Sequence, residues 1–410
     1  MSRTTRVLVA LLAGIATGWA VQGLSLPGRD ALEQFSDLIG GLWLDGLKMT
    51  ILPLIASLLI VGVCETAEQA SGSKLALRVM GLIGALLVAA TVLSAVLTPL
   101  LLSLWPSPSL ALLTSSSASH AQVVPPDVSQ FVRSLLPANI FQAAAEGSVL
   151  AVVVFCVLFA LGMTHVEPGQ RRAVVDFFRA CGNGLLKVVD GVLWLAPIGV
   201  FGLACLLGLR AGGAALGGLA HYVAVVCLIG SSAWALAYVV AALTRRTPFM
   251  AFVKAVLPAQ AVALSTQSSI AALPSMIAAT EVLGVRKETA SVALPLAVAL
   301  FRITGPSMNL AVAIYVAHVL GIELSVQSLA IGVCVALLTT IGSVGLPGQA
   351  SFLTSITPIA AAMGLPIEPL VIFLAIEMIP DLVRTMGNVT ADVALAAAAD
   401  REPETVEGIA

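Results

Sequence analysis

Long apolar runs dominate this 410-residue chain and restrict the folds that it can adopt. A helix crosses the hydrocarbon core of a bilayer with about 20 consecutive apolar residues. Eight runs reach that length, and we expect each to be a transmembrane helix: residues 5–24, 38–63, 77–105, 141–164, 184–209, 218–243, 288–317 and 368–396. The whole chain is 59% hydrophobic and only 10% charged. This balance excludes a soluble domain and is typical of a multi-pass helical membrane protein.

Basic residues in the loops predict how the chain is oriented. With the N-terminus in the cytoplasm, the inner loops hold most of them: Lys74, Arg78, Arg171, Arg172, Arg179, Arg245, Arg246, Lys254, Arg286 and Lys287. The outer loops hold little more than Arg29, Arg133 and Arg210. Because cytoplasmic loops are enriched in Lys and Arg, we expect a protein of the cell (inner or plasma) membrane, embedded in the lipid bilayer with both termini cytoplasmic.

Several function classes lack their sequence signatures. A net charge of −2 argues against nucleic acid as a partner. The cysteines and histidines have no metal-binding spacing, so we expect neither a metal site nor a cofactor. The HExxH and GxSxG patterns of hydrolases are absent, as is an ATP-binding loop. We therefore expect neither an enzyme nor a primary pump.

Two further apolar segments are interrupted at their middle by small polar residues, Gly or Pro. Residues 251–283 contain Ser265-Thr266-Gln267-Ser268-Ser269, and residues 328–366 contain Gly342-Ser343-Val344-Gly345-Leu346-Pro347-Gly348-Gln349. The flanks return each segment to the side it left, which predicts two re-entrant helical hairpins. A pair of broken segments in corresponding positions points to a transporter site. Taken singly, each segment also fits an ordinary helix with hydroxyls bonded to carbonyls, or a plain kink.

The last apolar run carries polar residues on one face. Six of them lie on or beside a single helical stripe: Glu377, Asp381, Arg384, Thr385, Asn388 and Asp392. Counted from Asp381, the last four stand at i+3, i+4, i+7 and i+11, which form one narrow stripe at about 100° per residue. Charges are costly in hydrocarbon, so such residues face a cavity or the bundle interior. The stripe therefore predicts a binding site with both signs of charge.

Over nearly its whole length, the chain resembles the glutamate-transporter family of dicarboxylate/amino acid:cation symporters. The most specific match is Arg384-Thr385-Met386 followed by Asn388-Val389-Thr390 and Asp392. Further matches are Leu47-Lys48-Met49 with Pro53 in the second span, Ala196-Pro197-Ile198-Gly199-Val200-Phe201 in the fifth, and Ser268-Ser269 with Leu273-Pro274 and Gly345-Leu346-Pro347-Gly348 at the hairpin tips.

The resemblance implies an all-α membrane fold of eight transmembrane helices plus two re-entrant hairpins. It also implies a homotrimer whose transport domain moves like an elevator against a scaffold. The implied divisions are 1–76 (scaffold spans 1 and 2), 77–140 (span 3 and an outer loop, transport domain), 141–215 (scaffold spans 4 and 5), 216–396 (transport domain) and 397–410 (cytoplasmic tail).

The resemblance also implies roles at the substrate site. Asp381 would hold a substrate amino group, and Arg384 a side-chain carboxylate. The substrate α-carboxylate would be held by Thr385, Asn388, Ser268, Ser269 and the second hairpin tip, which contains Gly345 and Pro347. The chemistry agrees, because a guanidinium fork matches a carboxylate and a carboxylate suits an ammonium group.

The seventh span departs from the family. The family motif is Asn-Met-Asp-Gly-Thr, and the ungapped alignment places Phe301-Arg302-Ile303-Thr304-Gly305 there. Phe and Ile offer no side-chain oxygen to sodium, and Arg302 adds a fixed cation. Arg302 could snorkel to an interface, but its mid-span position favours a partner in the core. We expect Asp392 as its first partner and Glu377 as its second.

These features predict a secondary transporter of an acidic amino acid (aspartate or glutamate) or a related dicarboxylate. We expect it to be independent of Na⁺ and coupled to H⁺, with Arg302, Asp392 and Glu377 as coupling residues and Glu377 as the proton carrier. The alternatives are a sodium-coupled dicarboxylate symporter, an uncoupled exchanger and an anion-conducting facilitator.

Overall fold

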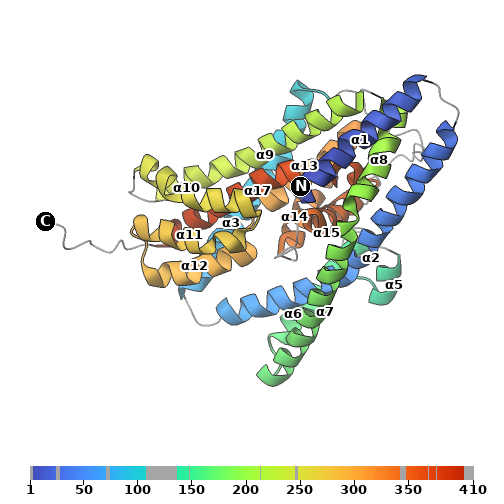
Figure 1. The fold of residues 1–410 in the computed structure, drawn as a ribbon. Helices are drawn as coiled ribbons and strands as arrows, with labels where there is room; N and C mark the ends of the chain where they lie inside the picture. The colour runs from blue at the N-terminus through green and yellow to red at the C-terminus, as the bar shows by residue number, and fades with distance from the viewer. Residues whose placement is uncertain are drawn as a thin grey trace.

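A computed structural model describes residues 3–24, 28–70, 74–107, 136–146, 148–212, 214–244, 248–341, 348–367, 369–374 and 376–400. Every regular element in these residues is a helix (Figure 1), which confirms the predicted all-α class for them. The first helices are α1 (Arg3–Leu24), α2 (Arg29–Ala70), α3 (Lys74–Leu104), α5 (Ile140–Ala145), α6 (Val149–Met163), α7 (Pro168–Trp194), α8 (Ala196–Ala211) and α9 (Ala214–Thr244). The later ones are α10 (Phe249–Thr266), α11 (Ser269–Val282), α12 (Lys287–Leu300), α13 (Thr304–Val319), α14 (Val326–Ile341), α15 (Gly348–Ala362), α16 (Leu370–Leu374) and α17 (Met378–Ala399).

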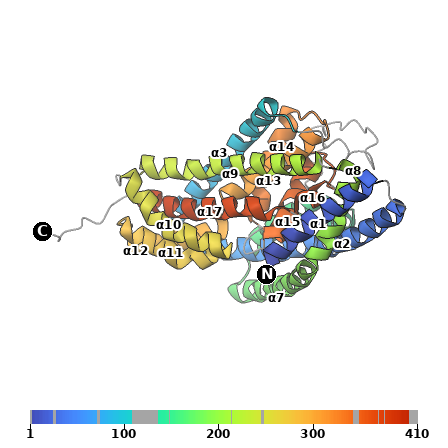
Figure 2. The ribbon, with the colours of Figure 1, turned by 45° about the horizontal axis from the view of Figure 1, so that its top comes forward.

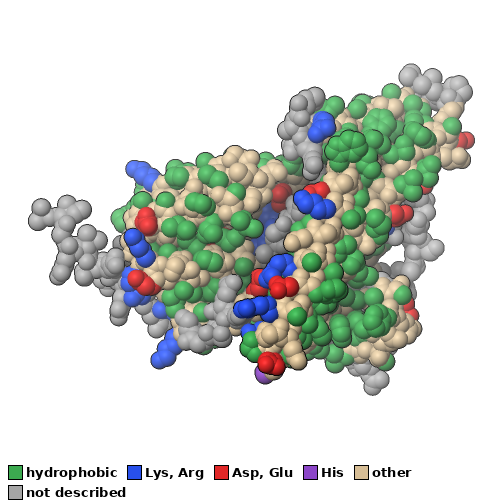
Figure 3. Space-filling view, turned by 60° about the horizontal axis from the view of Figure 1, so that its bottom comes forward, with side chains coloured by type: hydrophobic (Ala, Val, Ile, Leu, Met, Phe, Trp, Pro, Cys, Tyr) green, Lys and Arg blue, Asp and Glu red, His purple; other side chains and the backbone are tan. Residues whose placement is uncertain are grey.

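Several helices suit a lipid environment. Five of those described are long and apolar enough to cross a membrane, or six if the bent pair α7 and α8 forms one span. Large apolar side chains face outward, among them Leu42 (64% exposed) and Leu104 (75% exposed). Figure 3 shows hydrophobic side chains over much of one face of the molecule. Apolar surface of this kind fits lipid rather than water. The count of eight spans stays a prediction.

Helices α1 and α8 cross at close range because glycines line the crossing. A Cβ atom on Gly18 would lie 2.2 Å from the carbonyl oxygen of Cys205, and one on Gly208 would lie 2.3 Å from that of Ile15. Small residues let helix backbones approach in this way. Helix α2 packs against α8 and also against α6 and α7. Together α1, α2, α6, α7 and α8 form a first helix group, whose long members α1, α2, α7 and α8 lie to the right in Figure 1.

A second helix group surrounds α17. Helix α9 packs along α17, and α10, α11, α12 and α3 also contact it (Figure 2). The carboxylate of Asp400, at the end of α17, accepts hydrogen bonds from Arg286 Nε (2.7 Å) and from the Thr289 hydroxyl (3.3 Å). These bonds fasten the end of α17 to the start of α12. Helix α13 is buried from Thr304 to Ala317 and packs against α3, α9, α14 and α15.

Four predicted spans are each two helices in the structure: 141–164 (α5 and α6), 184–209 (α7 and α8), 288–317 (α12 and α13) and 368–396 (α16 and α17). Helices α7 and α8 meet at a bend of 56°. Helices α8, α13 and α17 each have a proline in their first turn, namely Pro197, Pro306 and Pro380. Proline fits there because the first N–H groups of a helix have no intrahelical acceptor. The breaks do not decide the number of spans, since Lys287–Val319 still qualifies as one candidate span across the break between α12 and α13.

Both predicted hairpins are pairs of helices that pack on each other, α10 with α11 and α14 with α15. The first pair is separated by Gln267, whose φ of 53° is left-handed. Ser268 then caps α11, because its hydroxyl accepts a hydrogen bond from the Ala271 amide at 3.3 Å. The tip of the second hairpin, residues 342–347, lies outside the described residues. The re-entrant position of both hairpins in a membrane stays a prediction.

Candidate functional site

The polar stripe of α17 is inside the protein. Its members Asp381, Arg384, Thr385, Asn388 and Asp392 are all buried. Glu377, which is fully buried, immediately precedes the helix after the break that separates α16 from α17. Burial of so many polar groups on one helix requires partners or a ligand.

Arg384 is the centre of this stripe. Its Nη1 lies 2.6 Å from Glu377 Oε1 and 3.2 Å from Asp381 Oδ1. Its Nη2 donates a long hydrogen bond of 3.4 Å to Asn309 Oδ1 on α13. Its Nε is buried and has no hydrogen-bond partner among the described residues. The guanidinium group therefore keeps donor capacity for another anion.

Glu377 is held from a second side by Tyr222 of α9. The Tyr222 hydroxyl donates to Glu377 Oε2 at 3.3 Å. The Tyr222 ring stacks on Phe373 with centroids 4.1 Å apart and is itself fully buried. Glu377 thus joins α9 to α17 and forms a buried ion pair with Arg384.

Asn388 is partly engaged by the start of α13. Its Oδ1 accepts hydrogen bonds from the Thr304 amide (3.1 Å) and hydroxyl (2.7 Å). The Thr304 hydroxyl also lies 3.0 Å from the carbonyl oxygen of Arg384. The structure describes no hydrogen bond from Asn388 Nδ2, so this amide group can donate to a ligand. The Thr385 hydroxyl donates to the Asp381 carbonyl at 2.8 Å and keeps its acceptor capacity.

The atypical motif forms the break between α12 and α13. Phe301 and Ile303 are buried, and Arg302 between them is half-buried. The charge of Arg302 interacts with those of Arg384, Asp381 and Asp392. Arg302 therefore lies close enough to the stripe for its charge to act on these residues.

Asp392 is the least satisfied member of the stripe. It is 1% exposed, and neither carboxylate oxygen has a hydrogen-bond partner among the described residues. Its charge interacts with that of Arg302, but the structure describes no direct contact between the two. Glu377, the second expected partner of Arg302, instead forms an ion pair with Arg384.

Charge does not balance within this cluster. Three carboxylates (Glu377, Asp381 and Asp392) interact with two guanidinium groups (Arg384 and Arg302). With every group ionised, three negative charges oppose two positive ones in a buried space. Such an excess is unfavourable at low dielectric, so one carboxylate is expected to take up a proton or a cation.

The structure describes only some of the binding residues predicted at the hairpin tips. Ser268 and Ser269 lie at the start of α11, and the structure describes no hydrogen bond between them and the polar stripe. Gly345 and Pro347 lie outside the described residues. Their roles in binding stay predictions.

Sequence reasoning missed several residues that organise the site. Tyr222, Thr304 and Asn309 contact the stripe from other helices. The Thr390 hydroxyl accepts from Trp234 Nε1 at 2.9 Å and from Gln260 Nε2 at 2.8 Å. A Tyr, an Asn or a Gln inside an apolar run was the available signal, although such residues also occur as ordinary interhelical contacts.

Known proteins resemble this chain along almost its full length. A proton/sodium-glutamate symport protein of Bacillus subtilis (strain 168) is 28% identical, covering 96% of this chain and 90% of that protein. A proton/glutamate-aspartate symporter of Escherichia coli (strain K12) is 26% identical, covering 94% and 89%. A C4-dicarboxylate transport protein 1 of Pseudomonas paraeruginosa is 26% identical, covering 95% and 88%.

The predicted resemblance is confirmed by the family match, which covers residues 4–402. The family consists of membrane symporters rather than enzymes. The chain belongs to the sodium:dicarboxylate symporter family.

Proposed function

We propose that this protein is a secondary transporter that moves an acidic amino acid or a related dicarboxylate across the cell membrane. The observation that carries the proposal is Arg384, a buried guanidinium group with an unpartnered Nε at the middle of the polar stripe. Carboxylates are the natural ligands of such a fork. The relatives described above are named for glutamate, aspartate and C4-dicarboxylates, all of which carry two carboxylates.

In this proposal, the substrate is held mainly by groups on one face of α17. Arg384 binds the distal carboxylate, and Asp381 binds an amino group where the substrate has one. Thr385 and the free amide of Asn388 bind the other carboxylate together with the hairpin tips. Asp381 lies only 3.2 Å from Arg384, so a zwitterionic substrate can satisfy both residues by separating their charges.

Coupling in this proposal uses protons rather than sodium. Phe301 and Ile303 are buried without side-chain oxygen atoms, and the fixed charge of Arg302 acts on Asp392. Sodium prefers several hard oxygen ligands; positions 301 and 303 supply none from their side chains, which leaves Asp392 and Asn388 as the oxygen-bearing side chains of the family pattern. The excess negative charge of the cluster is instead removed by a proton on Glu377. Protonation weakens the hold of Glu377 on Arg384 and frees the guanidinium group for the substrate.

The motion is an elevator movement within a homotrimer. The packing of the helices supports a division into two bodies. Helices α1, α2, α6, α7 and α8 form the first group, and α17 with its neighbours forms the second. All binding residues that the structure describes lie in the second group, which would carry the substrate past the first. Both termini are cytoplasmic in this proposal.

Two alternatives use the same site differently. In a sodium-coupled symporter, Asp392 would bind sodium with backbone carbonyls despite Arg302. In an uncoupled exchanger or anion-conducting facilitator, the cluster would keep its charge state throughout transport. Uphill accumulation driven by a proton gradient alone supports our proposal over both.

The direct test of the substrate site is uptake by purified protein in proteoliposomes. Arg384→Ala should abolish uptake of aspartate, glutamate and succinate, because the loss of one partner from a buried charge pair typically costs about 3–5 kcal/mol. Arg384→Lys retains the charge but not the fork, so partial activity is expected. Unchanged uptake of aspartate and succinate by Arg384→Ala would show that Arg384 does not bind a substrate carboxylate.

A further inference from the structure

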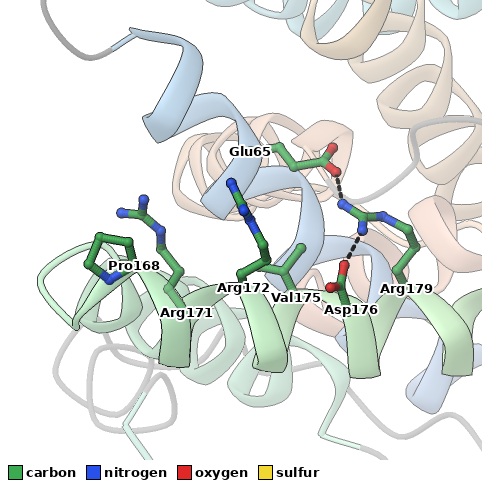
Figure 4. A pocket seen from close by; sticks show the side chains of 7 residues that line it. All are labelled: Glu65, Pro168, Arg171, Arg172, Val175, Asp176 and Arg179. Atoms are coloured by element: carbon green, nitrogen blue, oxygen red, sulfur yellow. Dashed lines mark hydrogen bonds and ion pairs between the residues drawn. The ribbon is translucent and has the colours of Figure 1, made fainter.

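A basic pocket lies where the end of α2 meets the first turns of α7. It has a volume of about 390 Å³ and is lined by Glu65, Pro168, Arg171, Arg172, Val175, Asp176 and Arg179. Figure 4 shows the side chains of Arg171 and Arg172 extending from α7 toward α2. The pocket belongs to the first helix group, so it is separate from the stripe on α17.

The two acidic residues of the pocket share one arginine, and the three arginines of the lining leave it with a net positive charge of one. Arg179 forms ion pairs with both Glu65 and Asp176. Figure 4 shows that this arrangement occupies one end of the pocket. Arg171 donates a hydrogen bond of 3.4 Å to the carbonyl oxygen of Thr164. Arg172 makes no hydrogen bond or ion pair with any residue that the structure describes. Its guanidinium group is therefore available to an anion.

The start of α7 adds to the positive potential. Glu167 occupies the N-cap position, but its side chain makes no capping hydrogen bond. The first amide groups of this 27-residue helix thus have no side-chain acceptor among the described residues. Helix N-termini attract anions through these amides and the helix dipole. The exposed guanidinium group of Arg172 and the uncapped start of α7 thus both lie beside this pocket.

The position of the pocket favours a lipid as the source of the anion. Glu65 ends the candidate membrane span Arg29–Glu65, which places the pocket at the edge of the apolar region. Leu161, one turn before Thr164, is 47% exposed, and Phe177, beside Asp176, is 62% exposed. Acyl chains can cover these apolar side chains while a phosphate occupies the pocket. Basic pockets between transmembrane helices commonly bind phospholipid head groups.

We propose that this pocket binds the phosphodiester head group of an anionic phospholipid, with Arg172 and Arg171 as its phosphate ligands. Such a lipid would fasten α2 to α7 and stabilise the first helix group. The proposal does not depend on the transported substrate, because binding can be measured without transport.

The test is thermal unfolding of the detergent-solubilised protein during titration with phosphatidylglycerol. Phosphatidylglycerol should raise the unfolding temperature, whereas phosphatidylcholine and inorganic phosphate should not. Arg172→Gln should weaken the apparent affinity about fivefold, the contribution typical of one basic residue near an anionic lipid surface. The double variant Arg171→Gln/Arg172→Gln should weaken it further.

Lys254→Gln is the matched control, because it removes one exposed positive charge from α10, in the other helix group. It should respond to phosphatidylglycerol like the unmodified protein. An unchanged response of Arg172→Gln, or equal losses in Arg172→Gln and Lys254→Gln, would overturn the proposed site. If inorganic phosphate raised the unfolding temperature as much as phosphatidylglycerol does, the occupant of the pocket would not be a lipid.

Discussion

Replacing Glu377 by Gln tests whether this carboxylate carries the coupling proton. Gln keeps the size of the side chain and removes its charge. Arg384 Nη1 then loses an ionised partner at 2.6 Å and keeps Asp381 at 3.2 Å. The variant therefore imitates protonated Glu377, and its substrate binding should no longer require a proton.

The size of the effect follows from the competition for Arg384. While Glu377 is ionised, a substrate carboxylate must compete with it for the same guanidinium group. The side chains of Arg384 and Glu377 are only 3% and 1% exposed, so solvent screens this contact little. A hydrogen bond to a charged group contributes about 1.5–3 kcal/mol. Removing the competitor should thus strengthen substrate binding by about 10- to 150-fold wherever Glu377 would be ionised.

The sign of the pH dependence is fixed by this reasoning. In the unmodified protein, affinity should fall as pH rises and Glu377 loses its proton. Glu377→Gln should bind equally well across the same range, and the two proteins should converge at acidic pH. Calorimetric titration of aspartate in nanodiscs measures both curves, with the exposed Glu323→Gln as control. An identical pH dependence in Glu377→Gln and the unmodified protein would refute the assignment.

Three other substitutions test separate parts of the account. Asp381→Asn should weaken aspartate binding more than succinate binding, because only aspartate has an amino group. Competition assays measure both affinities, and equal losses would show that Asp381 does not bind the amino group. Thr390→Val removes the hydroxyl that accepts hydrogen bonds from Trp234 Nε1 and Gln260 Nε2. It should destabilise the protein by about 1–3 kcal/mol for each of these donors left without an acceptor, whereas Thr390→Ser should keep the unfolding temperature unchanged. Gly208→Leu should overpack against α1 and reduce the free energy of unfolding, typically by about 1–3 kcal/mol, which lowers that temperature. Gly184→Ala, which meets open space, should not.

The sequence was sufficient to predict the buried polar stripe and the two pairs of packed helices, α10 with α11 and α14 with α15. Asp381, Arg384 and Asn388 recur at helical spacing inside an apolar run, and this periodicity alone places them on one face. The segment around Gln267 was predictable because five consecutive polar residues, 265–269, interrupt an apolar run. Both patterns are local, so they can be read from neighbouring residues.

The breaks in the helices and the partners of the stripe were harder to predict. Pro306 and Pro380 begin helices, whereas Pro53 and Pro295 lie inside helices. A proline therefore does not by itself distinguish a break from a tolerated position, since neighbouring helices can satisfy the freed backbone groups.

The pairing of Arg384 with Glu377 depends on a further long-range feature. Tyr222 of α9 holds the far oxygen of Glu377 and lies 155 positions away in the chain. Which carboxylate meets which arginine is decided by this packing. The mid-span position of Arg302 and its place in the family motif favoured Asp392 as its partner, and the sequence contained no information about Tyr222.

The central claim is that a fixed guanidinium group and a proton replace sodium in this transporter. The most direct measurement is calorimetric titration of the unmodified protein with aspartate, in sodium and in choline buffers of equal ionic strength, at several pH values. We predict equal affinity in the two buffers at each pH, and stronger binding at lower pH. A sodium-dependent gain in affinity of about tenfold or more, equivalent to about 1.4 kcal/mol, would contradict the account.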